Sequence, residues 1–353
     1  IFIFIIILFC QIPSYSKSSN NSKFNSKNLA NYFSAIVSTQ NQDTDNSLIF
    51  FETSKSLVDR HDPFLKQYIY TLVSGGNVDR AVGQIKLNFK KKNSKFFEAY
   101  LLLIIDSIKK ENISKSKKYL TKIKELKNIG QLELLIVESI DDYVYLFENN
   151  KISVKQSRFI NFNKISKVFQ NCYLGEDMTD VHFNSLINDY AIDYSRYLFF
   201  YINYLVNNNQ FDKAKEISSQ INVLNNNLLN VQAKEWIDNN KFKKFNQIFS
   251  CNNKNHLIGE LFFLVANLYS VQKNYEKSNF YLSISNFLNP KFKQNLVLAI
   301  ENYYVNENYS QLKKILRKFN KKDDLYYWYK IKKKTQIIAK EEDEIKSFNF
   351  INL

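Results

Sequence analysis

The sequence predicts an all-α protein, built as an α-solenoid of helix–turn–helix repeats. Glycine and proline are scarce, with 6 and 3 among 353 residues, which disfavours β-rich folds and phosphate-binding loops. Apolar residues recur at helical spacing from Asn28 almost to the end of the chain. Small or apolar positions also recur at intervals near 34 residues, which is typical of stacked helical pairs.

The clearest pair of helices is predicted between Gly259 and Pro290. Apolar and small side chains fall at i, i+3, i+4 and i+7 in a first helix and again in a second: Phe262, Val265, Ala266 and Tyr269, then Tyr275, Ser278, Leu282 and Ser285. The small residues are expected where the two helices approach closely. Asn289-Pro290 ends the second helix, because proline disfavours a helical residue before it.

The same pattern predicts further pairs along the chain. The residue that opens each second helix is expected at Ser47, Ala81, Ser116, Ala214, Phe245, Ser278 and Leu312, with intervals of 34, 35, 98, 31, 33 and 34 residues. The long interval is expected to hold irregular hairpins at about residues 129–194, with the Leu174–Asp180 loop breaking the register. The segment DDLYYWYKIKKKTQIIAK predicts the first helix of a further pair, after which the pattern stops.

Paired helices at this spacing resemble the tetratricopeptide repeat (TPR) superfamily from Asn28 to the C-terminus. Residues 259–290 match its pattern best, through Ala266, Tyr269, Tyr275, Leu282 and Pro290. The segments DTDNSLIFFETSKSLVDRHDPFLKQYIYTLVSGGNVDRAV and LFFLVANLYSVQKNYEKSNFYLSISNFLNPKF are also similar to exported TPR proteins of AT-rich alphaproteobacteria. The resemblance implies a bacterial envelope protein, from a family that binds proteins or peptides and is rarely catalytic.

The N-terminus predicts export. Residues 1–9 (IFIFIIILF) are an unbroken apolar run, too short to span a membrane, and residues 1–16 fit a signal peptide that lacks its first few residues. Residues 17–27 are polar and predict a flexible linker before the helical region of 28–353. Localisation is therefore expected to be periplasmic or envelope-associated. Cys172 and Cys251 could form one disulfide, but two isolated buried thiols are the preferred prediction, because the cysteines are far apart and in no C-x-x-C pattern.

The net charge of +15 raises nucleic acid as a partner, but 44 of the 49 basic residues are lysine. Arginine, the better reader of phosphates and bases, is not enriched, so nucleic-acid binding is the weaker alternative. No nucleotide-binding loop, metal-ligand spacing or converging catalytic set is present in the sequence. We therefore expect no enzyme, no cofactor and no metal site.

The leading hypothesis is a protein-interaction scaffold that binds a partner segment in the concave groove of the solenoid. In such an array the first helices of successive pairs line the groove. The residues predicted to face it are Lys66, Tyr70, Arg196, Phe199, Asn203, Phe263, Asn267, Glu301 and Tyr304. An alternative is that the chain is the regulatory or structural part of a larger envelope-biogenesis protein.

Overall fold

The computed structural model describes residues 25–155, 158–189, 193–224, 226–323 and 325–351, and all regular structure in these ranges is helical. The prediction of an all-α fold is confirmed. The predicted signal peptide and most of the predicted linker lie outside the described residues. The α-helices are α1 (Ser26–Gln40), α2 (Thr44–Thr53), α3 (Asp62–Ser74), α4 (Val78–Asn88), α5 (Phe97–Lys109), α6 (Ile113–Lys124), α7 (Gln131–Asn149), α8 (Ile160–Leu174), α9 (Thr179–Ile187), α10 (Tyr197–Asn207), α11 (Phe211–Ser219), α12 (Leu228–Asp238), α13 (Lys243–Ile248), α14 (Lys254–Val271), α15 (Tyr275–Leu288), α16 (Gln294–Val305), α17 (Tyr309–Leu316), α18 (Leu325–Glu341) and α19 (Glu344–Ile351), with short 3-10 helices η1 (Lys55–Asp59), η2 (Lys92–Ser94) and η3 (Lys321–Asp323).

One type of turn recurs between paired helices. In each case a residue with positive φ follows the first helix, and the next residue donates its backbone N–H to the carbonyl five positions back, as in Gly76 with Asn77 to Leu72 (2.8 Å) and Lys273 with Asn274 to Tyr269 (2.9 Å). This is the Schellman motif, which satisfies carbonyls at the end of a helix and reverses the chain. The positive-φ residues of these turns are Gln42, Gly76, Glu111, Gly175, Asn209, Asn240, Lys273 and Glu307.

The residue that follows each turn often caps the second helix. The side chains of Asp43, Asn112, Asn274 and Asn308 each accept a hydrogen bond from a backbone N–H in the first turn of that helix, which is the usual role of Asp and Asn at this position. The predicted opening residues of the second helices are all fully buried, with 0 % exposure, at Ser47, Ala81, Ser116, Ala214, Phe245, Ser278 and Leu312. Turn geometry and burial therefore follow the register that the sequence predicts.

The segment between Ser116 and Ala214 is organised differently from its prediction. Gly175 forms the same type of turn 34 residues before Asn209 and 64 residues after Glu111, so the Leu174–Asp180 loop keeps the register instead of breaking it. The irregular part is α7, a helix of 19 residues that no such turn joins to a following helix. Near the C-terminus, the sequence pattern was expected to stop after the helix that is α18. In the structure, α19 packs on α18, so these two helices form a further pair.

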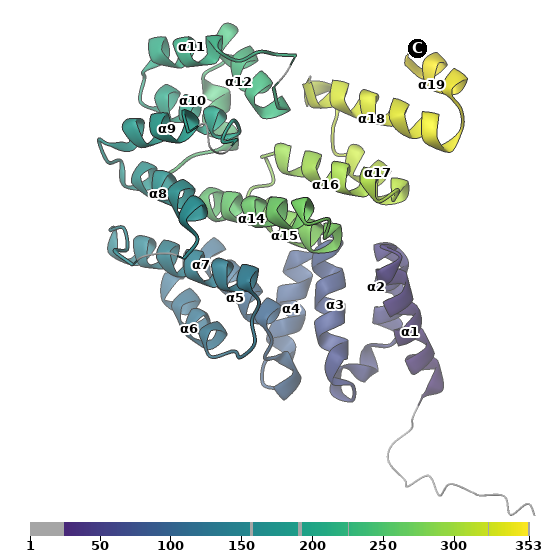
Figure 1. Cartoon of the computed structure of the whole chain (residues 1–353). Helices are drawn as coiled ribbons and strands as arrows, with labels where there is room; N and C mark the ends of the chain where they lie inside the picture. Colours follow the sequence, from purple (N-terminus) through teal and green to yellow (C-terminus); the bar gives the residue numbers. More distant parts are fainter. Residues whose placement is uncertain (1–24, 156–157, 190–192, 225, 324, 352–353) are drawn as a thin grey trace, which may run out of the picture.

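The predicted pair at residues 259–290 forms α14 and α15, which lie in the middle of the molecule (Figure 1). These helices pack on each other and also contact α3, α5 and α7 from the first half of the chain. Long-range polar contacts reinforce this packing: Lys277 bonds Glu133 at 3.1 Å, and Nζ of Lys109 bonds the carbonyl of Phe287 at 3.1 Å. In a simple array each repeat contacts only its neighbours, so these contacts show that the chain folds back on itself.

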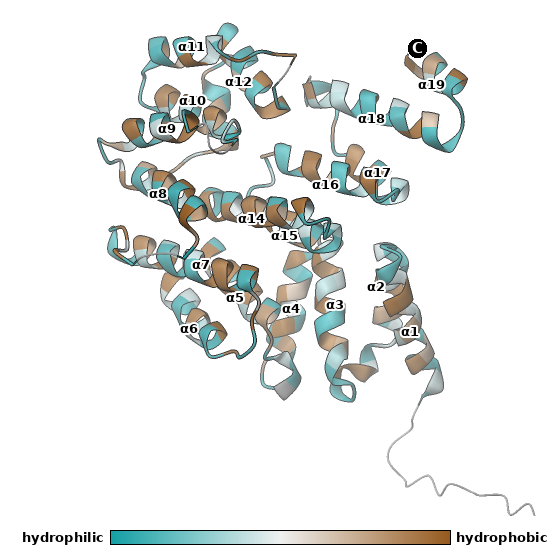
Figure 2. Cartoon of the chain, viewed as in Figure 1, coloured by the Kyte–Doolittle hydropathy of each residue, from teal (hydrophilic) through white to brown (hydrophobic). Residues whose placement is uncertain are grey.

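The burial pattern of α14 fits its position in the middle of the molecule. Hydrophobic residues run along much of α14 in Figure 2, and residues on nearly every side of this helix are buried, as expected for a helix enclosed by others. Close approach of α14 to α15 depends on small residues, since Oγ of Ser285 donates to the carbonyl of Gly259 at 2.5 Å. Ala266, Ser278 and Ser285 are fully buried, as the sequence predicts.

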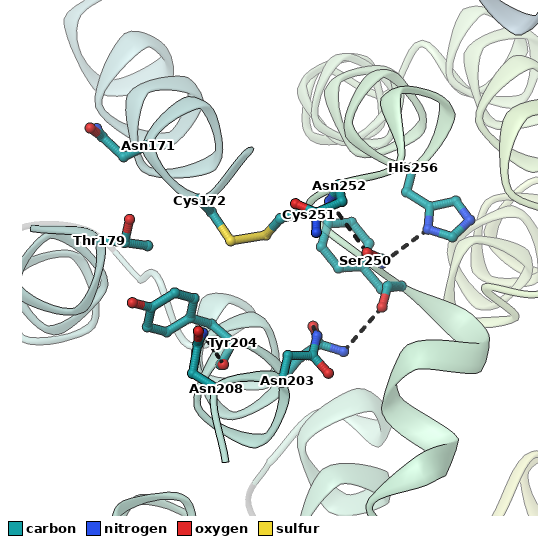
Figure 3. The surroundings of a disulfide bond; sticks show 12 residues. Asn171, Cys172, Thr179, Asn203, Tyr204, Asn208, Ser250, Cys251, Asn252 and His256 are labelled. Carbon is teal, nitrogen blue, oxygen red and sulfur yellow. Dashed lines mark hydrogen bonds between the residues drawn. A yellow bond between two sulfur atoms is a disulfide. The ribbon is translucent and has the colours of Figure 1, made fainter. Parts of the chain in front are cut away.

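A disulfide joins Cys172, near the end of α8, to Cys251, just before α14 (Figure 3). The prediction of two isolated thiols is therefore wrong, because the fold brings these cysteines to a Cα–Cα distance of 5.7 Å across 79 residues of sequence. Beside the bond, Nδ1 of His256 accepts a hydrogen bond from the backbone N–H of Ser250 at 3.0 Å. Burial and then the charge of Lys291 lower the pKa of His256 to about 4, which keeps the ring neutral as this acceptor at neutral pH.

The first and later pairs of helices also meet directly. Lys314 of α17 forms an ion pair with Asp45 of α2 at 2.6 Å, and the side chain of Asn308 donates to the carbonyl of Gln42 at 3.2 Å. Both contacts are polar and partly exposed, in contrast to the apolar packing around α14. Across the described ranges, no helix has both the length and the apolar character needed to cross a bilayer.

Candidate functional site

The residues predicted to face one groove lie in separate places. Phe199 and Asn203 of α10 are fully buried, and Phe263 of α14 is 7 % exposed. Phe199 packs against the rings of Phe245 and Phe292, with ring centroids 5.8 Å away in each case, and Asn203 donates to the carbonyl of Phe249 at 3.3 Å. The expectation that these three side chains face an open groove is wrong, because other helices cover both sides of α10 and α14.

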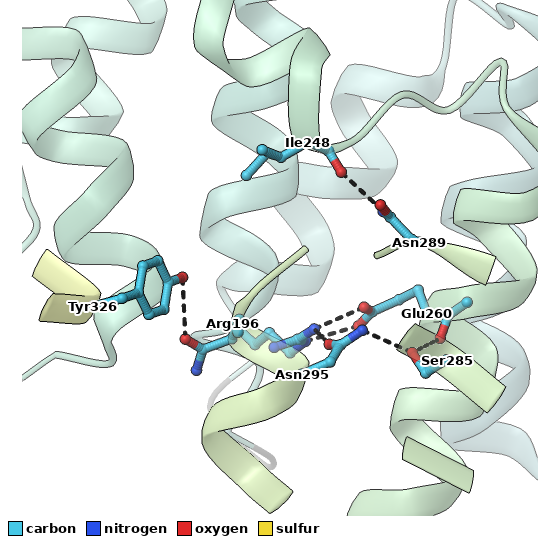
Figure 4. A network of polar contacts seen from close by, with 9 residues as sticks. Arg196, Ile248, Glu260, Ser285, Asn289, Asn295 and Tyr326 are labelled. Atoms are coloured by element: carbon cyan, nitrogen blue, oxygen red, sulfur yellow. Dashed lines mark hydrogen bonds and ion pairs between the residues drawn. The ribbon is translucent and has the colours of Figure 1, made fainter. Parts of the chain in front are cut away.

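Arg196 is also part of the interior and forms a double hydrogen bond with Glu260 (Figure 4). Both N–O distances are 2.8 Å, and the guanidinium carbon lies 3.5 Å from the ring centre of Phe263. Burial raises the pKa of Glu260, and the charge and hydrogen bonds of Arg196 oppose that rise. A planar bidentate pair of this kind, stacked on an aromatic ring, fixes the position of α10 relative to α14.

Glu301 and Tyr304 lie where α16 meets α18. Glu301 accepts hydrogen bonds from the hydroxyl of Tyr329 and from Nζ of Lys333, each at 2.6 Å. The same lysine lies 4.3 Å from the ring centre of Tyr304. These contacts join two neighbouring helical pairs. Asn267 lies one turn after Phe263 on α14 and, unlike Phe263, is exposed.

Lys66 and Tyr70 line an open cleft between the first half of the chain and the central hairpin. We call it the Tyr70 cleft. It has a volume of about 580 Å³, within the range of roughly 300–1,000 Å³ that binding pockets occupy. Its walls come from four parts of the chain: α3, the start of α5, the α6–α7 loop with the start of α7, and the α14–α15 turn with the start of α15. The cleft exists because α14 and α15 pack against the first half of the chain.

The lining of the Tyr70 cleft includes aromatic and apolar side chains. The ring of Tyr70 stacks on Phe280 of α15, with ring centroids 4.8 Å apart and planes inclined by 11°. Burial raises the pKa of the Tyr70 hydroxyl well above its usual range, and nearby acidic groups raise it further. Phe96, Leu126 and Ile129 also line the cleft. An apolar side chain of a ligand could therefore be buried here.

The charged groups of the cleft are unevenly paired. Glu98 lies 3.4 Å from Lys66, and Glu133 bonds Lys277 at 3.1 Å. Burial opposes ionisation of Glu133, but its own backbone N–H and Lys277 outweigh burial and lower its pKa. Lys95 and Lys127 also line the cleft and are exposed, and neither forms an ion pair with a described residue.

Gly130 lies beside Glu133 in the lining of the cleft. It precedes α7, and a Cβ atom at this position would lie 2.3 Å from Oε2 of Glu133. A larger residue would therefore require the end of the Glu133 side chain to shift, whereas Lys277 bonds the other oxygen, Oε1.

The carboxylates of the cleft differ in their surroundings. Glu98 and Glu133 are held in ion pairs. Glu276 also lines the cleft, forms no ion pair with a described residue, and has its pKa raised by burial. No group of three or more His, Cys, Asp or Glu among the described residues is placed to hold a metal ion. What the cleft offers is apolar area, two unpaired ammonium groups and side-chain amides such as Asn128 and Asn274.

Neither family models, nor curated proteins, nor solved structures gave a significant match to this chain.

Proposed function

We propose that this protein is an exported, non-enzymatic interaction scaffold whose TPR-like solenoid folds back on itself, and that it binds a partner segment in the Tyr70 cleft. The observation that carries the proposal is the cleft itself, with Tyr70 and Phe96 in its lining and exposed lysines at Lys95 and Lys127 that have no ion-pair partner among the described residues. The recurring turns at intervals near 34 residues support the TPR-like part of the proposal. The fold-back moves the binding surface from a continuous groove to this cleft.

The partner is a protein segment with an apolar side chain followed or preceded by carboxylates. The apolar side chain contacts Tyr70, Phe96 and Ile129, where burial of apolar area supplies affinity. The carboxylates bind Lys95 and Lys127, since charge complementarity selects partners and speeds their encounter. Asn128 and Asn274 can hydrogen-bond the backbone of an extended segment.

Export is supported by two independent features. The apolar run at residues 1–9 fits a signal peptide. The disulfide between Cys172 and Cys251 belongs to the chemistry of oxidising compartments and is uncommon where thiols are kept reduced. Together they favour a periplasmic or envelope-associated protein.

Charge reversal tests the proposed site. In K95E/K127E we expect binding of the partner segment to weaken at least tenfold, because two attractive contacts become repulsive; this corresponds to about 1.4 kcal/mol or more. The measurement is photo-cross-linking from a photoreactive residue placed at Gln67, which lines the cleft, followed by mass-spectrometric identification of the captured segment.

The matched control is K118E/K215E, which makes the same charge change at two exposed lysines away from the cleft. We expect this variant to retain cross-linking from position 67. Equal loss in both variants would show that net charge, and not the cleft, governs binding. Capture of segments without acidic residues would contradict the proposed recognition.

A further inference from the structure

A second hollow, with lining residues different from those of the Tyr70 cleft, is rich in lysine. It lies between α12, α13, the α15–α16 loop and the start of α18, and its volume is about 190 Å³. A space of roughly 10–15 Å³, measured the same way, admits one water molecule, so this hollow can hold a group of several heavy atoms. Its walls include Trp236, Ile248, Leu325 and Tyr326. We call it the Lys291 hollow.

Four lysines from three separate segments line the Lys291 hollow: Lys244 of α13, Lys291 and Lys293 of the α15–α16 loop, and Lys322 of η3. Two carboxylates, Glu235 and Asp323, also line it. The lining therefore carries more positive than negative charge, and like charges brought together by folding repel one another.

Neither carboxylate neutralises the charge of Lys244, Lys291 or Lys322, because each is paired with another lysine. Glu235 bonds Lys241 at 2.9 Å, and Asp323 forms an ion pair with Lys293 and accepts the backbone N–H of Asn320 at 2.8 Å. Lys244, Lys291 and Lys322 are left without an ion-pair partner among the described residues. Burial lowers the pKa of the nearby His256, and the charge of Lys291 lowers it further.

The three lysines are positioned by different parts of the fold. Nζ of Lys244 lies 5.8 Å from the ring centre of Trp236, so its stem follows an aromatic wall. Lys291 directly follows Pro290, where α15 has ended, and Lys322 is held on the short helix η3. Gln232 and Gln247 add side-chain amides that can donate hydrogen bonds.

We propose that the Lys291 hollow is a binding site for a phosphate group, either free or carried on a small molecule or lipid headgroup. A phosphomonoester has a charge of about −1.5 to −2 near neutral pH, which matches three otherwise unpaired ammonium groups better than a single carboxylate does. Lysine binds phosphate well as a point charge. The site is distinct from the Tyr70 cleft and needs no assumption about the partner that binds there.

Trp236 provides a direct readout of this site. The chain has two tryptophans, and the other one, Trp328, is 72 % exposed, so W328F leaves Trp236 as the only indole reporter. In W328F we expect a saturable change in fluorescence on titration with inorganic phosphate or glycerol 3-phosphate at constant ionic strength. Adding K291Q/K322Q to W328F should weaken the apparent affinity at least tenfold, while adding K118Q/K215Q, which removes the same charge elsewhere, should leave it unchanged.

Vesicles distinguish the two sources of the phosphate group. Binding to phosphatidylcholine vesicles containing phosphatidic acid, lost in K291Q/K322Q but retained in K118Q/K215Q, would identify a lipid headgroup; saturation by free phosphate without vesicle binding would identify a soluble ligand. Thermal unfolding of K291Q/K322Q checks that the variant is folded. Absence of a saturable signal with every phosphate probe, or equal weakening in the two double-lysine variants, would overturn the proposal.

Discussion

Replacing both disulfide cysteines in C172A/C251A is expected to lower the free energy of unfolding by about 4.5 kcal/mol. The disulfide closes a loop across 79 residues, and the chain-entropy relation for a loop of this length gives about that value. The bond also holds α8 next to the start of α14, so its loss removes a restraint on the central hairpin. Urea unfolding of the two proteins, compared at the same pH and temperature, measures the difference.

Reduction provides the control for this prediction. Unfolding of the unmodified protein in excess dithiothreitol should reproduce most of the loss, because it breaks the same bond without altering side-chain volume. If reduction leaves stability unchanged while C172A/C251A is destabilised, the effect comes from cavities left by the missing sulfurs. That result would contradict a stabilising role for the bond.

The second large effect is expected from R196M, which should destabilise the protein by about 3–5 kcal/mol at pH 7. Glu260 is 4 % exposed and accepts two hydrogen bonds from Arg196, so removing the guanidinium leaves a buried carboxylate without its partner. Methionine keeps apolar contact with Phe263. The double variant R196M/E260L also removes the buried carboxylate, and it should recover most of the lost free energy of unfolding. An apolar pair often replaces a buried ion pair at little cost in stability.

The destabilisation by R196M should increase as the pH rises from about 4.5 to 7. Burial already raises the pKa of Glu260, and without Arg196 nothing opposes this rise, so the folded state holds the proton to higher pH than the unfolded state does. The variant is therefore expected to lie closest to the unmodified protein near or below the ordinary pKa of a glutamate, about 4.3, and to lose stability as pH rises towards 7. Urea unfolding at pH 4.5 and pH 7 tests this, and an equal deficit at both values would contradict it.

Local structure was largely predictable from the sequence because its causes are local. A small residue such as Ser47 or Ala81 must sit where a second helix packs on the first, and a turn residue such as Gly76 or Asn209 must precede it at a fixed distance. Those constraints repeat with every pair. The spacing therefore predicts the turns of the regular pairs, whereas for residues 129–194 it predicts only irregular hairpins and places a break at Leu174–Asp180, where the structure has a turn at Gly175.

The exposure of the predicted groove residues was harder to predict because it depends on which distant helices meet. Assigning Phe199 and Asn203 to a groove assumed an array open on one side, whereas α10 is buried on nearly every side. Its sequence, YLFFYINYLVN, is apolar around the whole helix, and a helix of that kind is usually enclosed. This signal was present in the sequence and indicates that Phe199 and Asn203 are enclosed by other helices.

No local pattern identifies the contact between Lys277 and Glu133 or the disulfide between Cys172 and Cys251. Both join residues more than 70 positions apart, by 144 and 79 respectively, and both result from the fold-back of the chain around α14 and α15. The Tyr70 cleft has the same origin.

Zero-length carbodiimide cross-linking tests the fold-back most directly, because it joins lysine and carboxylate groups only when they are in contact. We predict amide links between Lys277 and Glu133 and between Lys314 and Asp45, whose N–O distances are 3.1 and 2.6 Å. A mixture of isotope-labelled and unlabelled protein identifies links within one molecule, and the pair Lys213–Asp180 at 2.6 Å serves as a contact between neighbouring helical pairs. Formation of both long-range links within single molecules would support the fold-back; formation of Lys213–Asp180 links without either of them would contradict it.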